Sequence, residues 1–397
     1  MVLAPYATQT AHSRGRLIPE PDNEPATSTL RTRFQRDRDR IVHSGAFRKL
    51  RNKTQVFVEF EGDFYRTRLT HTIEVAQIAR TISRALNLDE DLTEAIALAH
   101  DLGHTCFGHI GEEALNAAML PYGGFNHNDQ TFRILTELEH KYPLYRGLNL
   151  SWETLEGIVK HNGPLLPAKP GKEVPTTIAA FQDKWDLELN HWCGPEGQVA
   201  ALADDIAYNT HDVDDGVRAG FFTVRDIEVL PVFAELAAAG RTKYPGISDP
   251  LLIQETVRQA IGFMVDDLLT TTRARLAELK PRTVVDIRNA GQATICCSPA
   301  MQENFRIYRR FLMQRMYRHP DVNRFNTKAE RIVTGLFQFY MAHADCLPAD
   351  WYARLADDGG GDAEKRKARL IADYIAGMTD RYAVTEYQRV FSMDIFN

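Results

Sequence analysis

The chain has 397 residues, of which 44% are hydrophobic and 25% charged, and its formal net charge is −6. These values describe a globular protein with a sizeable core, and they exclude a bulk positive charge that would require nucleic acid as a partner. The five cysteines form no C-x-x-C pair and are odd in number, so we expect a reducing cytoplasm and no disulfide framework. Residues 1–30 lack the apolar segment of a signal peptide, and no stretch approaches 18 apolar residues, so we expect no membrane span.

The first sixty residues contain three segments of biased composition. Residues 1–30 are rich in Pro, Ser, Thr and Arg, and we expect this N-terminal segment to be partly disordered. Residues 31–51 are dense in Arg and are either a solvated charged helix or an arm that binds anions. Thr54 to Phe60 is the best candidate for a short strand or hairpin.

The rest of the chain shows a helical period, so we predict an all-α fold. Apolar residues recur at helical spacing from Thr72 onward. Asp91, with Glu94, is predicted to cap the next helix, which ends near Gly103; a further helix starts near Ile110. Later helices are predicted at 129–140, 151–161, 197–212, 250–280, 300–343, 363–376 and 381–391. We expect a core over 31–220 and a C-terminal helical region over 221–397 that packs on it.

Residues 100–113, HDLGHTCFGHIGEE, concentrate three His, one Asp and two Glu. A single pair such as His100–Asp101 would more often be structural, at the end of a helix. Here glycines allow the backbone to turn tightly and bring several side chains together. Such a density of polar groups is costly to bury unless the groups share a metal or an anion. The segment therefore predicts a functional site.

Two other segments offer partners for this site. His71 stands in RTRLTHTIEV, and Asp204 and Asp205 stand in VAALADDIAYNTHD. Asp204, Tyr208 and Asp212 lie at i, i+4 and i+8 and so share one face of a helix, which either lines a pocket or is a polar outer face. Two imidazoles and two carboxylates would suit Mn, Mg, Fe, Zn or Ni without selecting one of them.

His109 and Glu112 are three residues apart, beside the predicted metal ligands. If both lie in the first turn of a helix they share a face, and a carboxylate that orients a histidine makes a better acid/base pair than a bare histidine. His104, His127 and His161 are further candidates for the same pocket.

Together, these motifs resemble the deoxyguanosinetriphosphate triphosphohydrolase-like (dGTPase-like) branch of the HD-domain superfamily. The resemblance rests on RTRLTHTIEVAQIAR, ALAHDLGHTCFGHIGEEALN, GGFNHNDQTFRIL and LADDIAYNTHDVDDG. FQRDRDRIVHSGAFRKLRNKTQVF and DYIAGMTDRYA also match, so the resemblance covers roughly residues 13–392. It implies a helical HD core and metal-dependent hydrolysis of deoxynucleoside triphosphates (dNTPs) to deoxynucleoside and inorganic triphosphate.

The resemblance also implies a role for each matching position. The metal ligands would be His71, His100, Asp101 and Asp204. The acid/base group would be His109 with Glu112, and His104 and His127 would be further catalytic candidates. Substrate would be bound by Arg68 at phosphate, Tyr208 at the sugar, Asp212 at the 3′-hydroxyl, Lys49 and Leu50 near sugar and base, and Tyr317, with Arg315 and His319 as further candidates to complete the pocket.

This sequence departs from the family pattern at two places. Asp205 stands where the animal relatives have a phosphate-contacting Lys, so phosphate binding must differ. Asn126 and Asn128 flank His127 where many relatives have a Glu on one side, which leaves the role of His127 open. The resemblance further implies a homo-oligomer, often a hexamer, and allows an activating dNTP, although the allosteric site of the animal enzymes has no recognisable counterpart.

Other functions remain open at this point. The alternatives are an HD-domain nucleotidase, a (p)ppGpp-type phosphohydrolase, and a regulator that binds nucleotide or single-stranded DNA. The intact ligand set argues against a non-enzymatic regulator, and the Arg-rich segment 31–51 allows weak binding of single-stranded DNA as a secondary property.

Overall fold

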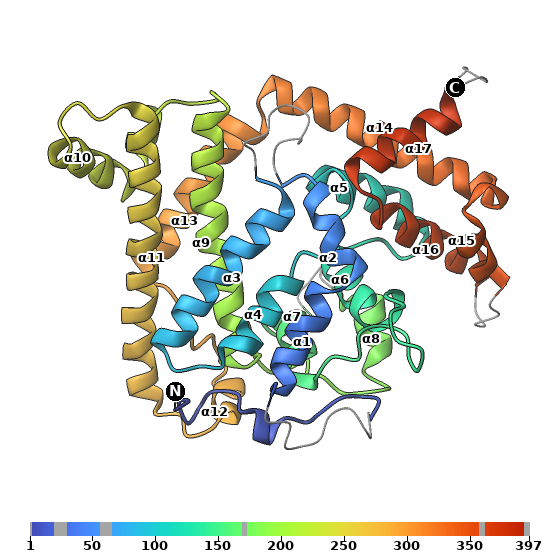
Figure 1. The fold of residues 1–397 in the computed structure, drawn as a ribbon, viewed down its shortest axis with the longest axis horizontal. Coiled ribbons are helices and arrows are strands. Elements are labelled where there is room, and N and C mark those ends of the chain that lie inside the picture. Colours follow the sequence, from blue (N-terminus) through green and yellow to red (C-terminus); the bar gives the residue numbers. More distant parts are fainter. Residues whose placement is uncertain (1, 20–29, 56–65, 169–172, 357–361, 393–397) are drawn as a thin grey trace.

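The computed structural model describes residues 2–19, 30–55, 66–168, 173–356 and 362–392, and its regular structure is helical (Figure 1). Within these ranges, β pairing is limited to isolated bridges, one of which joins Thr54 to Thr67. The predicted all-α class is confirmed. Of the candidate strand from Thr54 to Phe60, residues 56–60 lie outside the described residues. No helix in the described ranges is long and apolar enough to cross a membrane.

The helices are α1 (Arg33–Val42), α2 (Gly45–Lys49), α3 (Arg68–Ala85), α4 (Glu90–Ala99), α5 (Gly108–Met119), α6 (His127–Arg133), α7 (Trp152–Lys160), α8 (Thr176–Phe181), α9 (Pro195–Arg218), α10 (Phe233–Lys243), α11 (Asp249–Leu279), α12 (Val284–Arg288), α13 (Pro299–Leu312), α14 (Pro320–Ala342), α15 (Ala349–Ala353), α16 (Ala363–Ala376) and α17 (Asp380–Phe391). Two π turns continue helices, Ile134–Leu138 after α6 and Met313–Tyr317 after α13. Short 3-10 turns occur at Thr10–His12, Leu50–Asn52, Leu120–Tyr122, Asp226–Val229, Ala344–Cys346 and Arg354–Ala356.

The predicted cap of α4 was wrong by two residues. The Asp89 side chain accepts a hydrogen bond from the Leu92 backbone N–H at 2.9 Å and so caps the helix. Asp91 lies inside the first turn and pairs instead with Arg38 of α1 at 2.8 Å. A capping carboxylate must precede the free N–H groups that it satisfies, and only Asp89 does so here.

The long helix predicted over 300–343 is divided in the structure. It consists of α13, the π turn Met313–Tyr317 and α14, which begins at Pro320. Proline cannot donate the backbone hydrogen bond that a continuous helix requires, so it starts a new helix instead. The π turn changes the direction in which Tyr317 projects.

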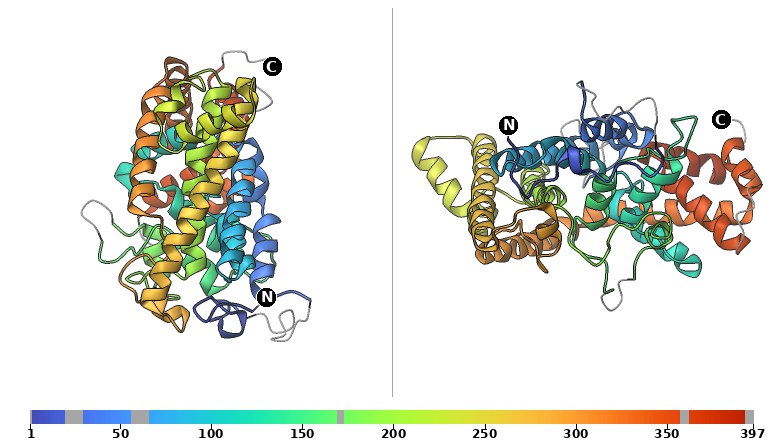
Figure 2. Two further views of the ribbon diagram at one scale, coloured as in Figure 1. Left: turned by 90° about the vertical axis from the view of Figure 1, so that its left-hand side faces the viewer. Right: turned by 90° about the horizontal axis from the view of Figure 1, so that it is seen from below.

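The buried apolar residues form two clusters. The larger cluster draws on α1, α3, α4, α7, α9, α11 and α13. The second draws on α5, α14, α16 and α17, at the right of Figure 1. Helices α9 and α11 run side by side, as the left view of Figure 2 shows. The turn between α4 and α5 therefore leads from the larger cluster to the second one, and the His-rich segment lies at their junction.

Part of the N-terminal segment packs on the larger cluster. The Thr8 hydroxyl donates to Glu196 at 2.6 Å, and the Ser13 hydroxyl donates to Glu153 at 2.6 Å. Residues 20–29 lie outside the described residues. The domain limits at residues 30 and 220 stay predictions.

Candidate active site

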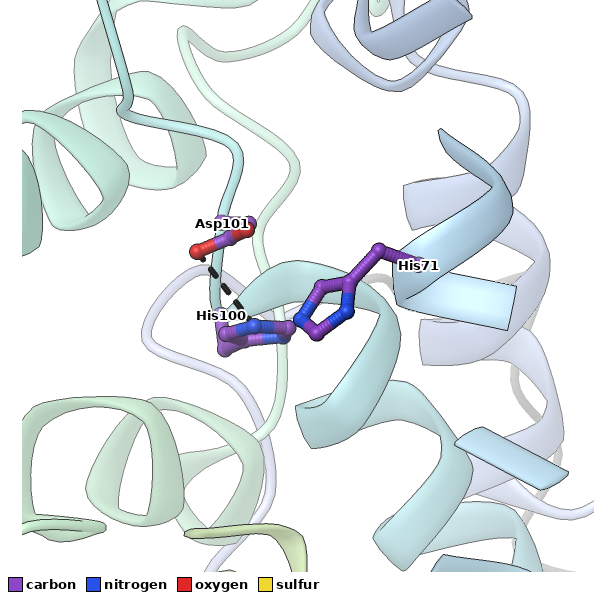
Figure 3. Close-up of side chains that lie close together, drawn as sticks. All are labelled: His71, His100 and Asp101. Carbon is purple, nitrogen blue, oxygen red and sulfur yellow. Dashed lines mark ion pairs between the residues drawn. The ribbon is translucent and has the colours of Figure 1, made fainter. Parts of the chain in front are cut away.

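The predicted metal ligands come from three helices and meet at the junction. His71 lies in the first turns of α3, His100 and Asp101 follow α4, and Asp204 lies on α9. One ligand atom from each of His71, His100 and Asp101 lies within 4.8 Å of the others (Figure 3). Asp204 Oδ1 is 2.9 Å from His71 Nε2 and 3.6 Å from His100 Nε2. The structure thus brings together all four residues.

The orientation of His100 fits a metal ligand. Its Nδ1 lies 2.7 Å from the Ala97 carbonyl oxygen, which can only accept, so Nδ1 carries a proton and donates it. Its Nε2 is buried and makes no hydrogen bond with the described residues, although Asp101 Oδ1 is 3.3 Å away. A histidine held through one nitrogen, with the other facing two carboxylates, has the arrangement that metal-binding histidines adopt.

The electrostatics of the cluster also fit a metal site. Burial lowers the pKa of His100, but the carboxylates of Asp101 and Asp204 outweigh burial and raise this pKa to about 9. Burial opposes the ionisation of Asp101, yet His100, His104 and Arg68 hold its pKa well below the ordinary range. A cluster that holds a proton this strongly has surplus negative charge, which is what a divalent cation requires.

Arg68 is buried beside this cluster at the first position of α3. One terminal nitrogen, Nη1, donates to Asp101 Oδ2 at 2.7 Å. The other nitrogens, Nε and Nη2, are buried and make no hydrogen bond with the described residues. A buried guanidinium with two unused donors is costly unless an anion completes it. Gly108 has a φ of +60°, and a Cβ there would lie 3.3 Å from Nη2, so glycine keeps this place open.

A second cluster lies next to the first and consists of His104, His109, Glu112 and His127. The rings of His104 and His127 stack with their centroids 4.2 Å apart, and His109 packs edge-on against His104 at 5.1 Å. Asp101 joins the two clusters, since its Oδ1 is 3.2 Å from His104 Nε2. Burial, together with the nearby Arg68 and His127, lowers the pKa of His104 well below its ordinary value, so this ring is neutral.

Glu112 pairs more closely with His127 than with the expected His109. His127 Nδ1 is 2.8 Å from Glu112 Oε1, and the His127 backbone N–H donates to the same oxygen at 2.8 Å. His109 Nδ1 lies 3.7 Å from Glu112 Oε2, beyond hydrogen-bond length, and its side chain is 66% exposed. Burial raises the pKa of Glu112, but the two histidines outweigh burial and lower it, so Glu112 is a carboxylate.

Gly103 explains why His127 reaches this place. A Cβ at Gly103 would lie 2.1 Å from the His127 carbonyl oxygen and 2.2 Å from the Thr131 nitrogen. The Gly103 N–H also donates to the Thr131 hydroxyl at 2.9 Å. Helix α6 therefore packs on the turn after α4 at backbone contact, which only glycine permits.

The predicted sugar-binding face is also assembled. The Tyr317 hydroxyl donates its single proton to the Asp212 carboxylate and accepts from the Tyr208 hydroxyl, 2.6 Å away. The two rings stack at a centroid distance of 6.4 Å. Burial raises the pKa of Asp212 to about 7, against the hydrogen bond from Tyr317. Tyr208 and Asp212 share the face of α9 on which Asp204 lies one and two turns earlier, so this face continues from the metal cluster.

Comparison with known proteins agrees with this geometry. Residues 68–209 match the family model described as HD domain, and residues 295–389 match the one described as phosphohydrolase-associated domain. A deoxyguanosinetriphosphate triphosphohydrolase-like protein of Parvibaculum lavamentivorans is 51% identical over 391 residues, 98% of this chain and 96% of the relative. A protein of the same name from Caulobacter sp. (strain K31) is 50% identical over 99% of this chain and 98% of the relative. Another from Brucella anthropi is 50% identical over 98% of this chain and 95% of the relative.

The chain belongs to the dGTPase-like family of HD-domain proteins. It is therefore a phosphohydrolase of the HD type, and the His/Asp cluster is the place where its HD domain could hold a divalent metal.

Two of the predicted substrate residues of this dGTPase-like chain contact other parts of the fold. Lys49 donates through Nζ to the Gly377 carbonyl oxygen at 2.6 Å, at the end of α16. Leu50 is 0% exposed and belongs to the larger apolar cluster. Their roles at sugar and base stay predictions, and for Leu50 the structure offers no accessible surface.

Arg309 on α13 was not among the residues predicted from the sequence. Its guanidinium pairs with the carboxylate of Asp205, the neighbour of the ligand Asp204. In this dGTPase-like chain a cation from a distant helix thus lies beside Asp205, where the family resemblance predicts a changed phosphate contact. The unusual Asp204–Asp205 pair was the only signal in the sequence, and it could not name the partner. Arg315 pairs with Asp226 at 3.3 Å instead of joining the pocket.

His161 and His319 make local contacts. His161 Nδ1 donates to the Ile158 carbonyl oxygen at 2.7 Å, one turn back in the helix. His319 caps α14, accepting from the Asp321 N–H, and its ring lies 4.4 Å from that of Phe221. His161 is nevertheless near the clusters, because burial lowers its pKa and the charges of His100 and Asp204 also act on it, so it stays a candidate for the site.

Proposed function

We propose that this chain hydrolyses dNTPs to deoxynucleoside and inorganic triphosphate in a metal-dependent reaction. The observation that carries the proposal is Arg68, whose two unused, buried donors lie beside Asp101 of the metal cluster. An anion that meets both a metal and this guanidinium is a phosphate group. The relatives' name specifies a deoxynucleoside triphosphate, and we extend that substrate class to this chain.

The metal would be held by His71, His100, Asp101 and Asp204, and Mn, Mg, Fe, Zn and Ni all suit this donor set. When bound, it would supply Lewis acidity toward a phosphoryl oxygen. In our proposal Arg68 binds the triphosphate, and Arg309, held by Asp205, adds a second cation on the opposite helix.

Proton transfer falls to the second cluster. We assign it to His109, because its exposed ring can meet substrate, whereas His104 is buried. Glu112 holds His127 by hydrogen bonds and lies 3.7 Å from His109, so it keeps both rings in place. His109 would exchange a proton with the attacking or the leaving oxygen at the α-phosphorus.

The sugar would pack on Tyr208, where a 2′-hydroxyl would clash, and its 3′-hydroxyl would bind Asp212. The hydrogen bonds of Tyr317 to both residues hold this face in place. In this proposal the site distinguishes deoxyribose from ribose by a hydrogen bond to Asp212 and by the close contact of Tyr208 with the sugar. We therefore expect dNTPs to be preferred over NTPs.

Product analysis tests this proposal. The purified chain is incubated with each dNTP and NTP, alone and in pairs, with manganese or magnesium. We expect deoxynucleoside and intact triphosphate from dNTPs. Monophosphate and pyrophosphate would overturn the reaction type, and turnover of a monophosphate or of (p)ppGpp alone would favour the alternative HD hydrolases. Turnover only in pairs would identify an activating dNTP.

Further expectations from the resemblance are proposed here too: a homo-oligomer such as a hexamer, and a cytoplasmic location. Weak binding of single-stranded DNA by residues 31–51 receives little support, because Arg38 pairs with Asp91 and the buried Arg40 donates to the Tyr145 hydroxyl. A steep loss of DNA affinity with salt would support it, and a flat dependence would contradict it.

A further inference from the structure

Phe107 has an unusual backbone conformation immediately before the helix that carries His109. Its φ is +63° and its ψ is +23°, in the left-handed region that a bulky side chain rarely adopts. The next residue, Gly108, also has a positive φ, of +60°. The Phe107 ring is buried in the second apolar cluster, so packing requires a phenylalanine where the backbone would favour a glycine. Such a conformation persists only where the surrounding structure holds it.

The group that holds this turn is the carboxylate of Asp380, the first residue of α17. Asp380 Oδ1 accepts from the Phe107 backbone N–H at 2.8 Å, across 273 residues of the chain. Its other oxygen, Oδ2, accepts from the Thr54 backbone N–H at 2.8 Å and from the Thr54 hydroxyl. One carboxylate therefore ties two distant backbone segments together.

Thr54 gives this carboxylate a second anchor beside the same turn. A Cβ at Gly108 would lie 3.5 Å from the Thr54 carbonyl oxygen, so the two backbones are adjacent. The neighbouring Lys53 donates through Nζ to the carbonyl oxygens of His104 and Ala376. The turn that leads into α5 is thus held both by the segment around Thr54 and by the end of α16 and the start of α17.

Asp380 is not needed to begin its own helix. The cap of α17 is Thr379, whose hydroxyl accepts from the Tyr382 backbone N–H at 3.3 Å. Asp380 is 4% exposed, and within the described part of the chain its carboxylate bonds to Thr54 and Phe107. A buried carboxylate is costly unless hydrogen bonds compensate for the lost water. The compensation here comes from the turn before α5.

We infer that Asp380 is a positioning residue for proton transfer, because it holds the turn from which His109 projects. The inference rests on the proposed function, in which His109 transfers the proton. His109 is the second residue of α5 and follows Phe107 by two positions, so a change in the Phe107 dihedral angles redirects its side chain. The ring is 66% exposed and lies 3.7 Å from Glu112, so its direction depends on the backbone that carries it.

This contact also joins the two regions that match family models. Phe107 and His109 lie within residues 68–209, the HD region, and Asp380 lies within residues 295–389, the phosphohydrolase-associated region. The associated region therefore supports the acid/base end of the active site. An HD region without it would lack the carboxylate that fixes the turn before α5.

Steady-state kinetics of the full, manganese-loaded chain test the inference, with the dNTP that the wild type hydrolyses fastest. Asp380→Ala should lower kcat about 30-fold and change KM less than about threefold, because a misplaced acid/base group slows the chemistry and leaves the phosphate contacts in place. Asp380→Asn retains one oxygen acceptor and should lose about fivefold. Asp350→Asn, at an exposed position in the first turn of α15, is the matched control and should keep the wild-type kcat. Wild-type kcat in Asp380→Ala would overturn the inference.

A double variant shows whether Asp380 acts through His109. In the His109→Gln background, Asp380→Ala should lower kcat by no more than about threefold, because the group that it positions is already absent. The same loss in both backgrounds would show a general structural effect and overturn the positioning role. Elemental analysis should find the metal retained in every variant. Loss of the metal in Asp380→Ala would assign the effect to the metal cluster instead.

Hydrogen exchange tests the contact without turnover. The Phe107 amide should exchange at least about 10-fold faster in Asp380→Ala and at least about threefold faster in Asp380→Asn, which guards against misfolding of the alanine variant. The Leu268 amide, within α11, is the reference and should not change. Unchanged exchange at Phe107 would overturn the inference. Release of monophosphate by the wild type would overturn the proposed reaction alone, whereas release of triphosphate with equal losses in both backgrounds would overturn this inference alone.

Discussion

The two neighbouring histidine clusters differ in how their carboxylates are used. In the first cluster, Asp101 and Asp204 face the inward nitrogen of His100, which makes no hydrogen bond within the described part of the chain. In the second, Glu112 is satisfied by a ring nitrogen and a backbone N–H of His127. Atoms of His104, Glu112 and His127 lie close enough to hold a metal too. His104 Nδ1 in the second cluster also makes no hydrogen bond with the described residues, so the comparison teaches that the use of the carboxylates, rather than the proximity of ligands, distinguishes a metal centre from an acid/base group.

Asp204→Ala should give the largest effect and test the first half of this comparison. We expect loss of the bound metal and a fall in kcat of about 1,000-fold or more, because Lewis acidity contributes several kcal/mol. Elemental analysis and turnover measure the two quantities. Asp205→Asn, one residue along α9, is the control and should retain the metal. Full metal content in Asp204→Ala would remove Asp204 from the ligand set.

Glu112→Gln should leave the metal in place and lower kcat about 100- to 1,000-fold, since it removes the carboxylate that serves the acid/base rings. The exposed neighbour Glu113→Gln is the control and should have wild-type activity. Loss of the metal in Glu112→Gln, measured by elemental analysis, would show that the second cluster is a metal centre, and the distinction between the two clusters would fail.

His109→Gln and His127→Gln decide which ring transfers the proton. We expect the His109 variant to lose about 100-fold in kcat, with an altered pH profile, and the His127 variant to lose about 10-fold with a profile like the wild type. Both should keep the metal. The opposite order would move the proton-transfer role to His127, the ring that Glu112 holds most closely.

The smallest expected effect concerns how the second cluster is anchored. Lys53 is buried and donates through Nζ to the His104 carbonyl oxygen at 2.5 Å and to the Ala376 carbonyl oxygen at 2.9 Å. Burial lowers its pKa to about 7, and nearby Lys49 adds to this. A neutral amine keeps two N–H donors for these carbonyls.

The direction in which folding stability changes with pH follows from proton binding at Lys53. Between pH 7 and about 10 the unfolded chain binds a proton at Lys53 that the folded chain does not. The free energy of unfolding therefore rises with pH across this window, and the contribution of Lys53 is lost as the pH falls to 7. Thermal melts at pH 7.5 and 9.5 should show a gain of the order of 1 kcal/mol per pH unit at its steepest. Lys53→Met should be less stable at pH 9.5 but lack this gain. An equal gain in the variant would assign it to other groups.

The sequence by itself determined the helices and the members of the site. Helical periodicity is a local property, so α7, α11, α16 and α17 were predicted close to their observed bounds, whereas the predicted helix 197–212 ended six residues before the end of α9. The residues of the two clusters could be named because HDLGHTCFGHIGEE packs most of them into one short segment. The cap of α4 was misplaced because Asp89 and Asp91 both suit the pattern, and only the path of the backbone selects one.

Only the tertiary structure decided which groups meet. Glu112 is three residues from His109 and fifteen from His127, yet it bonds the latter, because Gly103 lets α6 approach at backbone contact. Arg309 reaches Asp205 across 104 residues. Arg369 of α16 donates to Gln130 of α6 across 239 residues. Such pairs depend on how helices pack and on which side chains fill the space between them, and no local pattern in the chain carries that information.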